Sequence, residues 1–164
     1  MTQITRIEMD TAAMQRAAQA MQKLPHEMAR ANKSAITEAL LLLEREIKDD
    51  MPVGATNTLK GSITHALRGT PVDLSGKVFT PINYAMSVEL GTKPHFPPID
   101  PLTDWVKAKF DIQGAEARSV AFLIARKIAK KGTKGAHTFT NTLSAQSSQV
   151  LRILESAVDR VYGS

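Results

Sequence analysis

The sequence contains no cysteine, and aromatic residues make up only 5% of its 164 positions. The absence of cysteine excludes a disulfide framework and a thiolate zinc site, and it fits a reducing compartment. With so few aromatic side chains, aliphatic residues and methionine must fill the interior. No apolar run approaches the roughly 20 residues of a membrane-spanning helix. Residues 1–10, MTQITRIEMD, carry neither the basic n-region nor the apolar h-region of a secretory signal, so we expect none.

Acidic residues are missing from a long segment in the second half of the chain. Ala117 to Leu154 contains no Asp or Glu, although the whole chain has a net charge of only +5. The basic residues of this segment are Arg118, Arg126, Lys127, Lys130, Lys131, Lys134 and Arg152. Positive charge is therefore concentrated in one part of the chain, which bears on its partners more than on its fold.

Catalytic signatures are absent as well. The four histidines, His26, His65, His95 and His137, form no pair at the i,i+3 or i,i+4 spacing that would place two ring nitrogens against one metal ion. Asp100 and Asp104 are explained by helix capping and solvated charge better than by acid–base chemistry. The sequence has no G-x-S-x-G, P-loop or G-x-G-x-x-G motif. We therefore expect no enzymatic activity, no metal and no cofactor.

Length and composition predict a single domain over residues 1–164, because a chain of about 150 residues buries about 70% of its unfolded surface. Hydrophobic residues at 43% and charged residues at 23% are typical of globular proteins. In the first half of the chain we expect an extended arm at 1–9, a helical region at 10–50 divided before Pro25, a β-hairpin at 59–81 and a short helix ending at Gly91. In the second half we expect a proline-rich loop at 93–101, a helix starting at Asp100 or Pro101, a basic helix from Ala115 to Lys131, a loop from Thr133 to Thr142 and a C-terminal helix within 140–162.

The fold class follows from the two strongest patterns in the chain. From Glu27 to Lys48, apolar residues recur at helical spacing, which predicts a long amphipathic helix. Residues 59–67 alternate in polarity and are followed by the turn sequence GTPVD, which predicts a hairpin. Because a lone hairpin is marginal in water, it must pack on the helix or pair with further strands. We expect an α+β fold, a small antiparallel sheet packed against a long N-terminal helix, with further C-terminal helices whose last apolar face is Val150, Leu151, Leu154, Val158 and Val161.

Two features indicate contact surfaces. Phe96, Trp105 and Phe110 cluster around the proline-rich loop, where they could form either an interface hot spot or part of the core. The basic segment 118–134 could bind nucleic acid through its phosphates or meet an acidic neighbour.

The stretches MPVGATNTLKGSI and YAMSVELGT resemble the tail-completion proteins of long-tailed phages, the family to which the lambda minor tail protein Z is related. The matching residues are Pro52, Val53, Leu59, Ser62 and Ile63 in the first stretch and Tyr84, Ala85, Val88, Glu89, Leu90, Gly91 and Thr92 in the second. The later IARKIAKKGTKGAHTF is similar to a helix and Gly-Thr turn of longer members. The sequence departs from the family pattern at GATNT and in a longer, proline-rich loop after Thr92.

The resemblance implies a structural virion protein that joins head and tail in the neck, or completes the head-proximal end of the tail, after assembly in the bacterial host cytoplasm. Its partners would be copies of itself in a ring, expected to be a hexamer, and neighbouring neck and tail proteins, with DNA possible nearby and no membrane. The candidate interaction residues are Tyr84, Glu89, Thr92, His95, Phe96, Trp105, Lys127, Lys130, Lys131 and Lys134. The alternative is a cytosolic nucleic-acid-binding protein that uses the basic segment 118–134.

Overall fold

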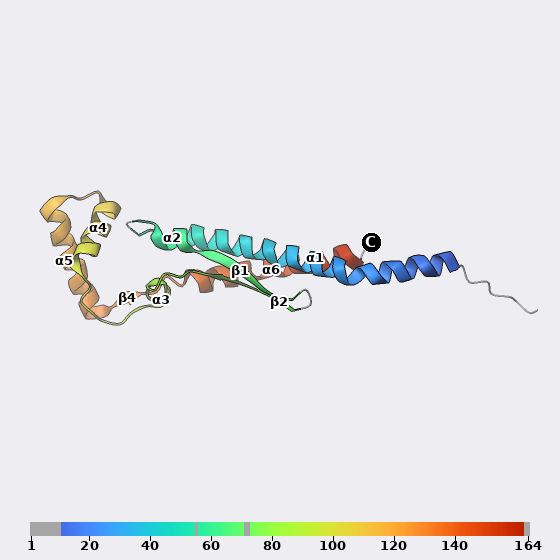
Figure 1. Cartoon of the computed structure of the whole chain (residues 1–164). Helices are drawn as coiled ribbons and strands as arrows, with labels where there is room; N and C mark the ends of the chain where they lie inside the picture. Colours follow the sequence, from blue (N-terminus) through green and yellow to red (C-terminus); the bar gives the residue numbers. More distant parts are fainter. Residues whose placement is uncertain (1–10, 55, 71–72, 163–164) are drawn as a thin grey trace, which may run out of the picture.

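One helix, α1 (Thr11–Asp50), runs along most of the length of the molecule (Figure 1). The computed structural model describes residues 11–54, 56–70 and 73–162, so the expected arm at 1–9 lies outside the described residues. After α1 the elements are α2 (Thr58–Ser62), β1 (Thr64–Thr70), β2 (Asp73–Phe79), α3 (Ala85–Leu90), β3 (Gly91–Thr92), α4 (Ile99–Phe110), α5 (Gly114–Lys131), β4 (Thr133–Lys134) and α6 (Thr138–Tyr162). The α+β fold class is confirmed, with the hairpin packed on the long helix.

The predicted division of the first helical region at Pro25 is wrong, because α1 continues through this proline. A proline inside a helix removes one backbone hydrogen bond and crowds the preceding turn, at a cost of about 3 kcal/mol. Its fixed φ is nevertheless close to that of a helix, so the disturbance is confined to one turn. The helix ends at Asp50, two residues before Pro52, as predicted.

Helix α6 packs along α1 in the antiparallel direction. Thr142 lies beside Asp50 and Gln146 beside Glu46, so residue numbers rise along one helix as they fall along the other. Small buried residues, including Ala35, Ala39 and Ala157, line the two helices. Two members of the apolar face predicted for α6 are instead exposed, Leu151 at 57% and Val158 at 41%. The other three members, Val150, Leu154 and Val161, are half-buried and form one stripe with the buried Ala157, and Leu151 and Val158 each lie one residue past that stripe.

The hairpin β1–β2 has the predicted antiparallel pairing, with Thr64 opposite Phe79 and Thr70 opposite Asp73. It packs closely on α1, since a Cβ added to Gly76 would lie 2.7 Å from a methyl group of Leu40. The predicted first strand began too early, because residues 58–62 form the short helix α2. Burial of Leu59 in the core favours this turn over the extended form that the local alternation indicated.

The main core lies where α1, α2, the hairpin, α3 and the start of α6 meet. Its buried members are Ile47, Met51, Leu59 and Ile63, and its half-buried neighbours include Val78, Ile82, Ala85, Val88 and Phe139. The two stretches that carry the family resemblance therefore contribute to one core.

Pairing between β3 and β4 was not expected from the sequence. Gly91 lies opposite Lys134 and Thr92 opposite Thr133, so part of the loop predicted after Thr133 is a short strand, and α6 begins at Thr138. Gly91 follows α3 as predicted and has a positive φ of 80°, but its ψ of −177° is extended and differs from the left-handed helical conformation expected there. The pairing joins residues 41 positions apart, which local patterns cannot reveal.

Helices α4 and α5 form a separate hairpin at one end of the molecule (Figure 1). Val106, Ala117 and Ala121 are fully buried between them and form a second, smaller core. The proline-rich loop is shorter than predicted, since α4 begins at Ile99. Pro101 fits the first turn of α4 because its missing N–H would have no helical partner there.

Candidate interaction surfaces

The carboxylate of Glu89 caps the N-terminus of α6. Glu89 Oε1 accepts hydrogen bonds from the backbone N–H of Thr140 at 3.0 Å and from its hydroxyl at 2.9 Å, and Oε2 accepts from the N–H of Phe139 at 3.1 Å. The backbone carbonyls of Val88 and Glu89 accept from Ala136 and His137. Glu89 thus joins the end of α3 to the start of α6.

The pKa of Glu89 lies below its ordinary value. Burial of the carboxyl raises this pKa, but the backbone N–H groups of Thr140 and Phe139 and the Thr140 hydroxyl together outweigh burial. The positive end of the α6 dipole favours the same ionised form. The sequence placed Glu89 among the interaction candidates, and the structure gives it this intramolecular partner.

Other candidates from the same stretch have different surroundings. Thr92 pairs internally, because its N–H and hydroxyl both lie 3.0 Å from the hydroxyl oxygen of Thr133. Tyr84 is 50% exposed, and the neighbouring Met86 and Leu90 on α3 are exposed as well. Of these residues, the apolar side chains of α3 are the ones free to contact another molecule.

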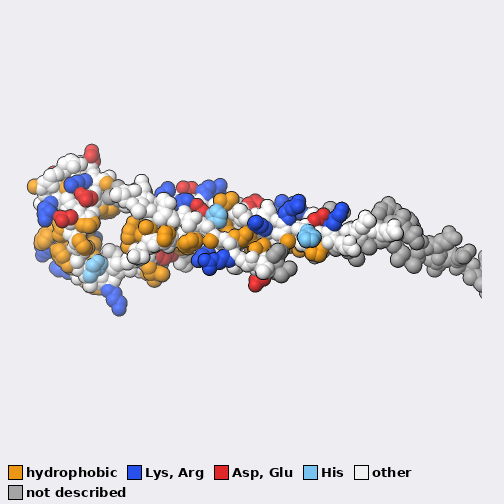
Figure 2. All heavy atoms as spheres, viewed as in Figure 1, with side chains coloured by type: hydrophobic (Ala, Val, Ile, Leu, Met, Phe, Trp, Pro, Cys, Tyr) orange, Lys and Arg blue, Asp and Glu red, His pale blue; other side chains and the backbone are white. Residues whose placement is uncertain are grey.

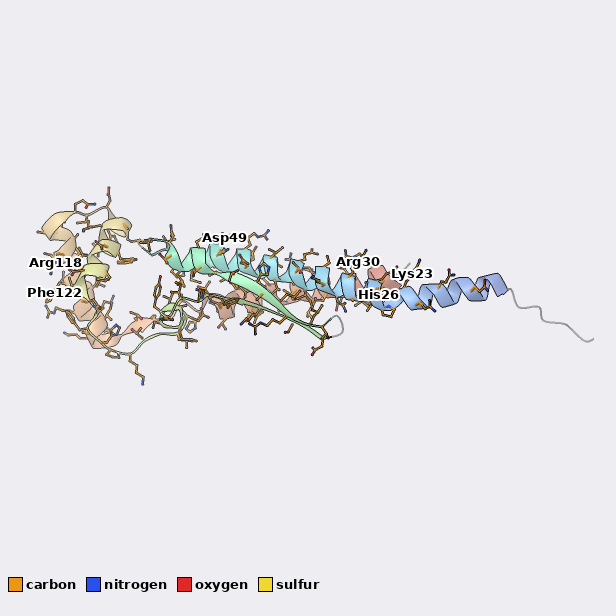
Figure 3. The ribbon with its side chains drawn as sticks, viewed as in Figure 1. Lys23, His26, Arg30, Asp49, Arg118 and Phe122 are labelled. Carbon is orange, nitrogen blue, oxygen red and sulfur yellow. The ribbon has the colours of Figure 1, made fainter. Side chains whose placement is uncertain are left out.

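Three exposed apolar residues form what we call the outer apolar face of the α4–α5 hairpin: Phe96, Phe122 and Leu123. The rings of Phe96 and Phe122 meet edge to face with centroids 6.1 Å apart. Phe122 and Leu123 also line an open depression of about 790 Å³ with Ile99 and Arg126. Figure 3 shows Phe122 and Arg118 on the side of α5 that faces away from α1, and orange side chains gather over this part of the surface in Figure 2.

Trp105 and His95 lie near this face but differ from Phe96. Trp105 is half-buried against the second core and contacts Phe110 edge to face at 5.6 Å, so its ring belongs mainly to the hairpin interior. His95 is exposed, and its Nδ1 lies 2.9 Å from the carbonyl oxygen of Lys93. The sequence left open whether these aromatic residues belong to the core or to an interface. In the structure Trp105 packs in the hairpin interior, and Phe96 lies on the surface.

Six exposed cations form a basic corner where α5 passes into β4: Lys93, Arg126, Lys127, Lys130, Lys131 and Lys134. Lys93 was not among the predicted residues. Its backbone is brought there by the β3–β4 pairing, since a Cβ on Gly132 would lie 2.9 Å from the Lys93 carbonyl carbon. Arg118, included in the predicted segment, instead pairs with Asp100 at 3.1 Å. Local sequence offered no signal for Lys93 because the contact depends on distant pairing.

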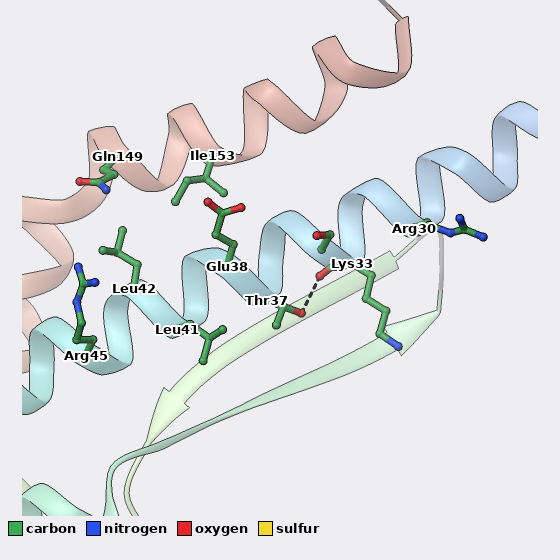
Figure 4. Close-up of a pocket in the computed structure, with 10 residues that line it drawn as sticks. Arg30, Lys33, Thr37, Glu38, Leu41, Leu42, Arg45, Gln149 and Ile153 are labelled. Carbon is green, nitrogen blue, oxygen red and sulfur yellow. Dashed lines mark hydrogen bonds between the residues drawn. The ribbon is translucent and has the colours of Figure 1, made fainter. Parts of the chain in front are cut away.

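A groove between α1 and α6 is a further surface that sequence reasoning missed. It has a volume of about 810 Å³ and is lined by side chains including Arg30, Lys33, Leu41, Gln149 and Ile153 (Figure 4). Leu41 is 53% exposed. No sequence pattern indicated this groove, because the groove forms only where α6 lies along α1.

Within the described ranges, no group of three His, Asp or Glu side chains could hold a metal ion. None of the described helices combines the length and apolarity of a transmembrane segment. Comparisons of the chain with protein-family models, curated proteins and solved structures found no significant match.

Proposed function

We propose that this chain is a structural virion protein of a long-tailed phage, a tail-completion or head–tail joining component that assembles into a ring in the neck. The proposal combines the motif resemblance at Pro52–Ile63 and Tyr84–Thr92 with one structural observation: a single chain leaves an unusually large and partly apolar surface uncovered. The ring is proposed as a hexamer on the basis of the resemblance.

The accessible surface of the chain is 12178 Å². A compact monomer of 17.9 kDa exposes about 8,000 Å². If every residue outside the described ranges is given the accessible area of an unfolded chain, those residues contribute about 2,400 Å². The described residues then expose about 9,800 Å². The elongated chain therefore exposes more area than a compact monomer of its mass, which favours a subunit that completes its packing against neighbours.

The α4–α5 hairpin supports the same interpretation. Its fully buried described side chains are small, namely Val106, Ala117, Ala121 and Ala125, while Phe96, Phe122 and Leu123 are 54%, 48% and 62% exposed. It stands at the end of the body and is connected to it mainly through the loop after β3 and the β3–β4 pair (Figure 1). An isolated pair of helices this small normally needs further packing. We propose that the outer apolar face contacts a neighbouring subunit in the assembly.

The proposal predicts that deleting the gene from its phage leaves unjoined heads and tails, or defective tails, in electron micrographs. A plasmid copy of the wild-type gene should restore infectious particles. The double substitution Phe122→Ser and Leu123→Ser should fail to do so, because it removes apolar area from the proposed contact without touching a buried residue. Normal particles from the deletion phage would refute the function.

The matched control is Leu151→Ser, which alters a side chain that is 57% exposed on α6 and lies outside the motifs of the resemblance. Isolated surface apolar residues of this kind are common and carry little energy. The control should complement normally. Equal complementation by the double variant would show that the outer apolar face is not the contact surface.

A further inference from the structure

The basic corner has no acidic partner among the described residues. None of its six cations forms a hydrogen bond or ion pair there, whereas other cations of the chain do, such as Lys48 with Glu44 and Lys107 with Asp104. Five of its six cations lie within the segment from Ala117 to Leu154, which contains no acidic residue, and only Lys93 lies outside it. Figure 2 shows Lys and Arg side chains on the part of α5 near β4. Six positive charges therefore lack a described acidic partner: four on the last two turns of α5, one on β4 and one directly after β3.

A second copy of this chain does not offer a matching acidic surface. Five carboxylates already pair with cations of their own chain: Glu44, Glu46, Asp49, Asp100 and Asp104. Of the remaining described carboxylates, Glu89 on α3 caps α6, and the others are scattered over α1, β2, α5, α6 and the turn after α4. A ligand that pairs with all of the corner at once would therefore be a different molecule with dense negative charge.

We propose that the basic corner binds the phosphate backbone of double-stranded DNA without sequence preference. Arg126 to Lys131 occupy the last turns of α5, a span of about 7.5 Å at the helical rise of 1.5 Å per residue, and Lys134 follows on β4. One DNA strand presents a phosphate about every 3.4 Å along the axis, so the part of the corner on α5 alone covers roughly two to three phosphates. Lys127 and Lys131 are four residues apart, so they lie on the same side of α5 about 6 Å apart along its axis.

The composition of the corner favours DNA over an acidic protein. Leu123, Arg126, Lys127, Lys130 and Lys131 line a shallow depression of about 270 Å³, in which the leucine is the only apolar side chain. The cores of protein interfaces are depleted in lysine and enriched in aromatic residues, which lie instead on the neighbouring outer apolar face. Lysine is a flexible point charge, suited to phosphate contacts that do not read bases. This binding does not depend on ring assembly.

The test is fluorescence anisotropy of the full chain with a labelled DNA duplex of mixed sequence between 50 and 200 mM NaCl. If all six cations contact phosphates, the slope of log affinity against log salt is about −5. The triple variant Lys127→Ala, Lys130→Ala and Lys131→Ala should make the slope shallower by nearly 3 and weaken binding at 50 mM NaCl at least tenfold. A duplex of unrelated sequence should bind equally well.

The matched control removes three cations elsewhere, Lys23→Ala, Arg30→Ala and Lys33→Ala on α1, so that the net charge changes by the same amount (Figure 3). This variant should keep the wild-type slope. Three binding results would each overturn the proposal, and a fourth comes from the assembly state. The binding results are no duplex binding at 50 mM NaCl, an equal loss in both triple variants, or binding of polyglutamate but not of DNA, which would identify an acidic protein partner. Light scattering then measures the assembly state of each variant. If DNA binding is lost only in variants that also fail to assemble, the proposed direct contact between the corner and DNA is contradicted.

Discussion

Substitution of Glu89 offers the sharpest test of how the two halves of the fold are joined. Glu89→Ala removes the acceptor for the N–H groups of Phe139 and Thr140 at the start of α6, where helical N–H groups have no partner within the helix. Loss of an N-cap acceptor costs about 0.5–2 kcal/mol, and bonds to a charged group lie toward the upper end of such values. We therefore expect the free energy of unfolding to fall by about 2 kcal/mol.

For a chain of this size, a loss of about 2 kcal/mol lowers Tm by about 4–8 °C. Circular dichroism during heating measures this shift, and hydrogen exchange localises it. The amide protons of Phe139 and Thr140 should exchange faster in Glu89→Ala, while amides in α5 should be unaffected. Glu89→Gln keeps one acceptor oxygen without the charge, so its loss should be roughly half as large.

The effect of Glu89 should depend on pH in one direction. Because the pKa of Glu89 is lower in the folded chain than in the unfolded chain, the unfolded state binds the proton more readily. The stabilisation is thus complete above the ordinary carboxyl pKa and is lost as the pH falls through the lowered folded value. The Tm difference between wild type and Glu89→Gln should shrink over that acidic range.

The control is Glu116→Ala, which removes an exposed glutamate from the first turn of α5. It shares the favourable position near a helix N-terminus but has no hydrogen bond to another described residue, so only the small dipole contribution is lost. If Glu89→Ala and Glu116→Ala shift Tm equally, and the amides of Phe139 and Thr140 exchange at wild-type rates, the capping role is refuted.

Two further substitutions test contacts that hold the elements together. Gly132→Ala should destabilise the chain by about 3 kcal/mol or more. The φ of 68° and ψ of −162° at Gly132 are restricted to glycine, and the added Cβ would lie 1.9 Å from the carbonyl oxygen of Thr92. Gly54→Ala, which places its Cβ near no other atom, is the control in the same thermal assay. Glu44→Gln should lower the free energy of unfolding by about 1 kcal/mol at neutral pH and speed hydrogen exchange in β1. The reason is that hydrogen bonds with His65 and Lys48 lower the pKa of Glu44 and join the sheet to α1. An unchanged exchange rate in β1 would contradict this.

Sequence reasoning succeeded where periodicity and turn chemistry act locally. The amphipathic pattern from Glu27 to Lys48, the hairpin turn near Gly69, and the glycines that close α3 and α5 all required only neighbouring residues. It wrongly divided the helix at Pro25, because the general energetic cost of a proline inside a helix was taken to end it. The helix α1 tolerates the one backbone hydrogen bond that Pro25 removes. It also misplaced the start of β1, because the burial of Leu59 outweighed its alternating context.

The candidate surfaces divide in the same way. The excess of lysine and arginine after Ala117 is a property of the sequence, and any fold of this chain must place that charge somewhere. Whether each charge is free depends on distant neighbours: Arg118 is paired by Asp100, and Lys93 joins the basic corner only through the β3–β4 pair. Glu89 is the clearest case, since its position in a family-like motif did not show that it caps a helix 50 residues away.

The amino-acid order alone thus accounts for the α+β class, the long amphipathic helix and the basic segment, because each depends on residue type and short-range spacing. The tertiary structure decided which apolar side chains stay uncovered and which charges lack partners. Burial and pairing are set by residues far apart in the chain, such as Phe96 against Phe122 and Thr92 against Thr133. The proposed subunit contact and the proposed DNA contact both rest on those long-range placements.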